Sequence, residues 1–138
     1  MTTADKPAAD WYKPSFDDGQ WKTGKSPVGS GLPGGIAQGT DWNDTPGDIW
    51  LRRTLTLPNR PITNPNFMLC HDEDTEIYIN GVLALSEAGY NGGYEAIDAL
   101  PAARALLKPG ATISLAVHFR QTTGGQGFDM GLANVIQP

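Results

Sequence analysis

The sequence has only one cysteine and two histidines among its 138 residues, and it contains no long hydrophobic run. The lone cysteine, Cys70, excludes a disulfide framework and a cysteine-rich zinc site, and we expect it to be buried as a small apolar side chain. Two histidines exclude a three-histidine metal centre. No window approaches the roughly 18 apolar residues of a membrane-spanning helix, so no membrane insertion is predicted.

Basic residues are also scarce, because 10 Lys and Arg stand against 15 Asp and Glu and give a net charge of -5. No basic run could neutralise a phosphate backbone, so the sequence excludes nucleic acid as a partner. The first ten residues lack the apolar core of a signal peptide. If the protein is exported, we expect its signal or flanking domains to have been removed, and we interpret the chain as an excised module.

Glycine and proline, by contrast, are abundant, with 17 and 11 residues, whereas hydrophobic residues make up only 39% of the chain. This composition indicates many turns between short elements and favours β structure over α. We expect a flexible lead-in at residues 1–10, one domain at residues 11–138 and one short helix at residues 101–107. Alternating apolar residues predict strands at residues 49–57, 67–71, 77–79, 82–85, 111–119 and about 128–132.

An Asn80-Gly81 pair gives the clearest turn signal in the chain, because these residues accept the positive φ angles of a type I′ hairpin. A two-residue turn places Ile79 opposite Val82 and Ile77 opposite Ala84. With six or seven short strands and no repeated crossover helices, the fold class predicted is all-β, an antiparallel β-sandwich with one short helix.

Signals for catalysis are weak. Residues 29–34 match G-x-G-x-x-G, but Pro33 and the following glycines prevent the helix that a dinucleotide site requires. There is no G-x-S-x-G elbow, and the many carboxylates single out no pair of the kind that glycosidases use. We therefore predict that the chain is not an enzyme.

Alternating acids at Asp72, Asp74 and Glu76 resemble part of a calcium loop. The EF-hand pattern fails, because Ile77 stands where glycine is required and Leu83 where glutamate is required. Three readings stay open: a structural Ca²⁺ held by Asp72 and Asp74 with backbone carbonyls, a solvated acidic strand entry paired with an arginine of the 49–57 strand, and contact with a ligand.

The chemistry of the loops favours sugar binding, because sugars offer hydroxyls for hydrogen bonds and apolar C–H faces for aromatic stacking. Trp42 lies between polar residues in a glycine-rich loop at residues 25–47 and is the expected stacking platform, whereas Trp11, Trp21 and Trp50 are expected to pack in the core or its rim. Residues 43–45 fit the N-glycosylation pattern. The predicted ligand-binding residues are Trp42, Tyr90, His118, Arg120, Gln121 and Gln126, with Asp72 and Asp74 as further candidates.

Four motifs together resemble a known family. They are the Asp-Asp-x-x-Trp turn at residues 17–21, the Arg-Arg strand at 48–58, the Asn-Gly hairpin at 76–82 and the segment at 107–117. These motifs resemble the amino-terminal sugar-binding-like domain of family 2 glycoside hydrolases. Residues 71–76 and 121–126 are similar to galactose-binding-like modules appended to bacterial polysaccharide-processing enzymes.

The resemblance implies a galactose-binding-like jelly roll in an extracellular or periplasmic setting. It implies as partners a polysaccharide or oligosaccharide and the catalytic domain of a larger enzyme. Two functions remain open: a non-catalytic carbohydrate-binding module of a secreted glycan-degrading enzyme, or a structural accessory domain that docks against the catalytic domain without binding sugar. The matching motifs mainly hold the fold, so they assign no sugar site by themselves.

Overall fold

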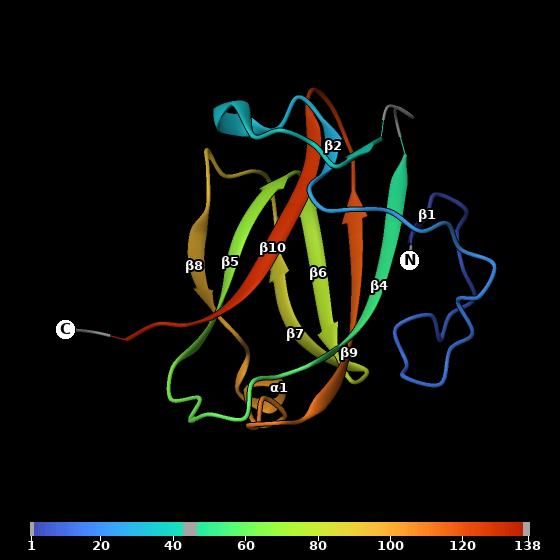
Figure 1. The fold of residues 1–138 in the computed structure, drawn as a ribbon. Coiled ribbons are helices and arrows are strands. Elements are labelled where there is room, and N and C mark those ends of the chain that lie inside the picture. Colours follow the sequence, from blue (N-terminus) through green and yellow to red (C-terminus); the bar gives the residue numbers. More distant parts are fainter. Residues whose placement is uncertain (1, 43–46, 137–138) are drawn as a thin grey trace.

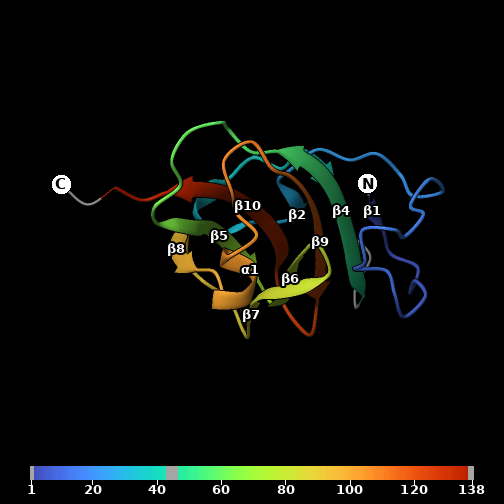
Figure 2. The same ribbon diagram turned by 90° about the horizontal axis from the view of Figure 1, so that it is seen from below.

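The computed structural model describes residues 2–42 and 47–136, and within them the chain forms two five-stranded sheets stacked face to face (Figures 1 and 2). This arrangement confirms the predicted β-sandwich. The potential glycosylation pattern at residues 43–45 lies outside the described residues. No helix of the described part is long and apolar enough to cross a membrane.

Sheet A contains, in spatial order, β1 (Thr2–Thr3), β4 (Asp48–Thr56), β9 (Thr112–Arg120), β6 (Asp74–Ile79) and β7 (Val82–Glu87). Sheet B contains β3 (Thr40–Asp41), β2 (Val28–Ser30), β10 (Gln126–Asn134), β5 (Pro65–Asp72) and β8 (Glu95–Asp98). All neighbours are antiparallel except β2 and β3, which are parallel. The helical elements are the 3-10 turn η1 (Pro33–Gly35) and α1 (Pro101–Arg104).

The core lies between the sheets and follows the predicted alternation. On β9, Ile113, Leu115, Val117 and Phe119 are buried. Their neighbours Thr112, Ser114, His118 and Arg120 are more accessible. Phe67 and Leu69 of β5 complete the centre of the core with no exposed surface. Free Cys70 is buried as well, as the sequence predicts.

Two segments predicted to lack regular structure contribute strands. Residues 2 and 3, assigned to the flexible lead-in, form β1, which pairs with Trp50 and Leu51 of β4. The loop at residues 25–47 contains β2, η1 and β3, and β2 pairs with the start of β10. β1 and β2 are each paired to a long neighbour, and runs of two or three residues give no periodic signal in the sequence.

The Asn-Gly hairpin forms as predicted, with φ of 49° at Asn80 and 81° at Gly81, and Ile79 pairs with Val82. The second predicted pair is wrong, because a bulge between Ile77 and Tyr78 pairs Ile77 with Leu85 instead of Ala84. The extra residue allows Ala84 and Leu85, which are consecutive, both to be buried.

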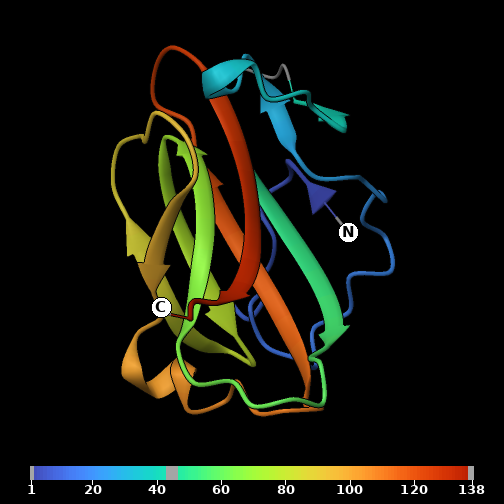
Figure 3. The same ribbon diagram turned by 60° about the vertical axis from the view of Figure 1, so that its left-hand side comes forward.

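Helix α1 covers the end of the sandwich that lies at the bottom of Figures 1 and 3. It begins at Pro101, as predicted, but ends at Arg104 and not at Leu107. Turns carry the chain on from there, and Leu107 is buried in the core. The helix is held at its start by Leu100, whose backbone N–H donates to the carbonyl of Ala84.

A second apolar cluster lies on the outer face of sheet A, where the N-terminal segment crosses it (Figure 2). Trp11 of this segment is buried together with Trp50 and Ala116 of the sheet, and Tyr12, Phe16, Trp21 and Tyr78 pack around them. The predicted packing role of Trp11, Trp21 and Trp50 is thereby confirmed. The N-terminal segment is therefore part of the domain.

Candidate functional site

The predicted ligand-binding residues come together at one end of the sandwich, opposite α1, which we call the loop end (top of Figure 1). Pairing places them there: Arg120 lies opposite Asp48 and Asp74, and Asp72 lies opposite Gly127. The exposure of these side chains differs widely, however. That difference decides which of them can touch a ligand.

Trp42 is not the stacking platform that its loop context predicts. Its side chain is only 4% exposed and belongs to the main core, where its ring meets that of Phe119 edge to face at 5.2 Å between centroids. Its backbone N–H donates to the carbonyl of Gly29, which fixes it beside β2. A buried ring has no free face for a sugar, so Trp42 is a core residue.

Gln121 and Gln126 are also buried, which corrects their predicted role as ligand contacts. The amide of Gln126 donates to the carbonyl of Trp42 and so links β10 to the loop that carries the tryptophan. The amide of Gln121 donates to the carbonyl of Gly124 at 3.3 Å and closes its own loop. Both side chains hold the loops in place.

His118 is half-buried on the outer face of sheet A, where its ring stacks on Trp50 at 4.9 Å with an interplanar angle of 4°. Its Nε2 lies 2.8 Å from a carboxylate oxygen of Asp48, and its Nδ1 lies 3.7 Å from one of Glu76. Both ring nitrogens therefore face carboxylates. These contacts hold the His118 ring against the sheet face.

Arg120 and Asp74 lie at the edge of a small polar hollow of about 290 Å³ on the same face, together with Glu76, Glu87 and His118. Arg120 is exposed, so its guanidinium is available to a ligand. Asp74 is partly engaged, because its Oδ1 accepts the backbone N–H of Gly89 at 2.8 Å.

Asp72 lies where three loops meet. Its backbone forms an isolated bridge with Tyr90, and its carboxylate faces Gly125 of the β9–β10 loop. A Cβ at Gly125 would lie 2.7 Å from Asp72 Oδ2 and 3.7 Å from the carbonyl oxygen of Gly31. A carboxylate and a backbone carbonyl thus border the space that glycine leaves free. Within residues 2–42 and 47–136, no group of three or more His, Cys, Asp or Glu side chains is placed to hold a metal ion.

The Asp72 carboxyl is also electrostatically unfavourable when charged. Burial raises its pKa above the usual range, the neighbouring Glu73 adds to the increase, and His71 opposes it. A higher pKa in the folded state means that the protonated form stabilises folding below the unfolded-state pKa. That contribution is lost as the pH rises through the folded-state pKa.

Asp72→Asn is therefore expected to raise the melting temperature at pH 7 in EDTA, because it removes a charge that the fold disfavours. Near pH 3, where the wild-type carboxyl is largely protonated, the effect should be much smaller. Thermal unfolding of both proteins at the two pH values measures the difference, and Asp5→Asn on the exposed lead-in is the control. Equal shifts at both pH values would contradict the assigned cause.

The most exposed aromatic ring of the described residues belongs to Tyr90, which is 74% exposed. Its loop is held by the next residue, the buried Asn91. The side chain of Asn91 accepts from the N–H of His71 at 2.9 Å and donates to the carbonyl of Leu69 at 2.9 Å. The N–H of Asn91 also donates to the carbonyl of His71. Three hydrogen bonds to β5 therefore fix the backbone beside an exposed ring.

Tyr94 follows on the same loop and reaches across the outer face of sheet B. Its hydroxyl donates to Asp129 of β10, whereas Tyr94 itself precedes β8, so its side chain spans the intervening strand β5 at Cys70. The hydrogen bond to Asp129, followed by burial, raises the pKa of Tyr94 to about 12. Asp129 also accepts from the hydroxyl of Ser26. The ring of Tyr94 is 45% exposed and held at both ends.

Sequence reasoning missed two residues that shape this surface, Asn91 and Asp129. The alternation of Phe128, Met130 and Leu132 indicates that Asp129 leaves β10 on the outer face, but nothing local to the sequence connects it to Tyr94. Asn91 begins an Asn-Gly-Gly run that reads as an ordinary turn. Its role becomes visible only when β5 lies beside it.

No protein-family model matches the sequence, and no curated protein matches it significantly. Among solved structures, a β-glucuronidase from Faecalibacterium prausnitzii is 25% identical over 53% of this chain and 12% of its own, with a TM-score of 0.39. The PA14 domain of the MpAFP antifreeze protein is 16% identical over 72% of this chain and 48% of its own, with a TM-score of 0.47. The chain therefore spans less than half of either structure, and the likeness to each is partial.

Proposed function

We propose that the chain is a non-catalytic carbohydrate-binding module that holds a polysaccharide against the exposed tyrosines of the β7–β8 loop. Tyr90 provides the main stacking surface, and Tyr94 of the same loop provides a second ring. In this proposal the module belongs to a secreted glycan-degrading enzyme, in an extracellular or periplasmic setting, and works beside its catalytic domain.

The observation that carries the proposal is an exposed tyrosine on a fixed loop. An isolated exposed aromatic residue is common, but here the backbone beside Tyr90 is held by the three hydrogen bonds of Asn91. A ring that is already positioned loses little conformational freedom when a sugar stacks on it. Tyrosine also combines an apolar face with a hydroxyl, which suits the mixed surface of a sugar.

Polar groups that suit sugar hydroxyls lie at the same end of the sandwich as these rings. Asp72 is joined to Tyr90 through its backbone bridge, and its carboxylate has accessible surface at the loop end. Arg120 and Asp74 lie opposite one another across β9 and β6. Carboxylates and guanidinium groups can each form paired hydrogen bonds with neighbouring hydroxyls.

Existing contacts of the carboxylates support a non-catalytic role. A glycosidase needs two carboxyl groups facing each other across a bound sugar. Asp48 faces His118, Asp74 accepts from Gly89, and Asp129 accepts from both Ser26 and Tyr94. Each of these side chains is engaged in holding the structure.

Affinity electrophoresis against a panel of soluble polysaccharides tests the proposal. Tyr90→Ala is expected to weaken retardation by about tenfold or more, equivalent to about 1.4 kcal/mol, with no change in melting temperature. Leu100→Ala is the control, because Leu100 is an exposed apolar side chain beside α1 at the opposite end. It should bind like the wild type.

Failure of every polysaccharide to retard the wild-type chain would overturn the proposal. That result would favour a structural accessory domain that docks against a catalytic domain without binding sugar. The burial of Trp42, Gln121 and Gln126 favours this second candidate, since the loop residues best suited to sugar contact hold the fold together.

A structural Ca²⁺ at Asp72 is a further part of the proposal. The Asp72 carboxylate and the Gly31 carbonyl border the same space beside Gly125, and both are oxygen ligands of the kind that calcium prefers. Melting temperature is expected to be higher in millimolar calcium than in EDTA, and Asp72→Asn should abolish the difference. Identical melting in calcium and EDTA would exclude the ion.

A further inference from the structure

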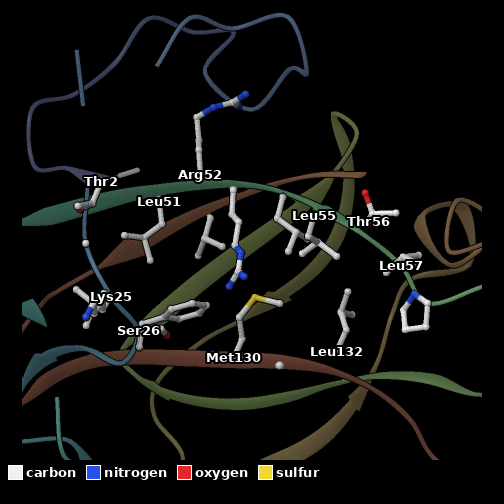
Figure 4. Close-up of a pocket in the computed structure, with 18 residues that line it drawn as sticks. Thr2, Lys25, Ser26, Leu51, Arg52, Leu55, Thr56, Leu57, Met130 and Leu132 are labelled. Carbon is white, nitrogen blue, oxygen red and sulfur yellow. The ribbon is translucent and has the colours of Figure 1, made fainter. Parts of the chain in front are cut away.

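An open cleft lies between the two sheets on the side where β4 and β10 face each other (Figure 4). It has a volume of about 910 Å³ and leads from solvent into the core. Figure 4 shows Leu51 and Leu55 of β4 pointing toward Met130 and Leu132 of β10 across this space. All four side chains are only partly buried.

Strand edges border the cleft on both sheets. β1 pairs with β4 only at Trp50 and Leu51, so residues 52–56 have a described partner on one side only, which is β9. β2 pairs with β10 only at residues 126–128, so residues 129–134 are paired only with β5. The described chain therefore leaves an edge of about six residues on β10, with N–H and C=O groups free to pair with another strand.

Arg53 lies in the wall of this cleft. It pairs across the sheet with Leu115, whose side chain is buried in the core. It lies between Leu51 and Leu55 on the same face of β4. Arg53 thus interrupts the apolar face that Leu51 and Leu55 form. Arg53 is nevertheless exposed, and it forms no ion pair with any residue in 2–42 or 47–136. A cation with no ion-pair partner in the described part of the chain thus lies beside an apolar space.

We propose that this cleft receives an extended segment of a partner polypeptide, which adds as a strand to the free edge of β10. Its apolar side chains, at alternate positions, fill the space between Leu51, Leu55, Met130 and Leu132. One acidic side chain of the segment pairs with Arg53. The backbone edge makes a strand a better occupant than a compact ligand, because alternate residues of an added strand can form ladder hydrogen bonds with β10.

The dimensions and chemistry agree with such an occupant. Six residues of β10 span about 20 Å, the length of an ordinary strand. Alternate side chains of an added strand point into the sandwich, which matches the apolar lining. Contiguous exposed apolar surface typically marks an interaction site. The positive charge of Arg53 favours a segment with a negatively charged side chain opposite it.

A peptide library displayed on phage tests the proposal with a defined probe. The nine-residue peptides carry Val, Ile, Leu or Phe at alternate positions. Random polar residues occupy the positions between them and also replace some of the apolar ones. Selections are run on the whole wild-type chain, on Arg53→Glu and on Arg60→Glu. Arg60 is an exposed arginine outside the cleft, so its variant carries the same change of charge.

We expect peptides selected on the wild type and on Arg60→Glu to carry Asp or Glu at one fixed position. Peptides selected on Arg53→Glu should carry Lys or Arg there. Hydrogen exchange with a selected peptide should slow at least tenfold at amides in residues 129–134, and replacing a peptide residue that donates to β10 by proline should abolish binding.

Three results would overturn the proposal. In the first, peptides of the alternating library are not enriched over those of a library with the same composition and a scrambled order. Arg53 would then be a charge that only protects the strand edge from aggregation. Another is protection at the edges of β7 or β8 in place of β10. The third is a dimer of the wild-type chain, lost in Arg53→Glu, which would assign the cleft to a second copy. None of these results depends on sugar binding.

Discussion

Replacing Trp42 by alanine is expected to lower the free energy of unfolding by about 3–5 kcal/mol, the largest effect of any substitution considered. The ring is 4% exposed and packs edge to face against Phe119, which is fully buried. Removing it leaves a cavity at the loop end and breaks the contact between the loop and the core. Urea denaturation followed by circular dichroism measures the loss.

Two controls separate packing from sugar contact. Trp42→Phe keeps an aromatic ring in the same space and should lose less than half as much stability as Trp42→Ala. Tyr90→Ala removes an exposed ring and should change stability by no more than about 0.5 kcal/mol. If Trp42→Ala kept wild-type stability but lost polysaccharide binding, Trp42 would be a ligand platform and its assignment to the core would be wrong.

Arg52→Ala is expected to lower the free energy of unfolding by about 3 kcal/mol, because it removes a buried side chain together with its ion pair to the half-buried Asp18 and its other contacts. Arg52 is 6% exposed, and its Nε lies 3.0 Å from a carboxylate oxygen of Asp18. Its guanidinium also donates to the carbonyl of Trp11 and lies over the ring of Phe16, 5.3 Å from the centroid. These contacts attach the N-terminal segment to sheet A.

The adjacent arginine provides the matched control. Arg53 has the same charge and belongs to the same strand, but it points to the opposite face and is exposed. Arg53→Ala should therefore change stability by no more than about 0.5 kcal/mol. Limited proteolysis adds a second readout, since Arg52→Ala should speed cleavage within residues 5–20 and Arg53→Ala should not. Equal losses of stability in the two variants would show that Arg52 does not anchor the segment.

The strands that could be predicted are those with enough residues to display a period. Alternation over Ile113 to Phe119 places four side chains in the core, and the Asn80-Gly81 pair fixes the hairpin turn. The bulge at Ile77 could not be predicted, because it follows from the burial of both Ala84 and Leu85 against the rest of the domain.

Loop context predicted the candidate site as a set of single residues, of which the structure places Asp72, Asp74, Tyr90 and Arg120 at one end of the sandwich. It failed for Trp42, since a tryptophan among polar residues reads as exposed until β2 and Phe119 are known to lie beside it. Polar neighbours in the sequence do not determine which side of a loop faces the core.

The sequence by itself determined the class of fold, the hairpin turn, the helix start at Pro101 and the position of Arg53 on an otherwise apolar strand face, because these depend on local conformation and on the two-residue period of a strand. Tertiary structure alone decided which aromatic rings are buried, that the N-terminal segment covers sheet A, and that the space between β4 and β10 is open. Those properties depend on contacts between residues far apart in the chain, such as Arg52 with Asp18 and Tyr94 with Asp129, and no local pattern encodes them.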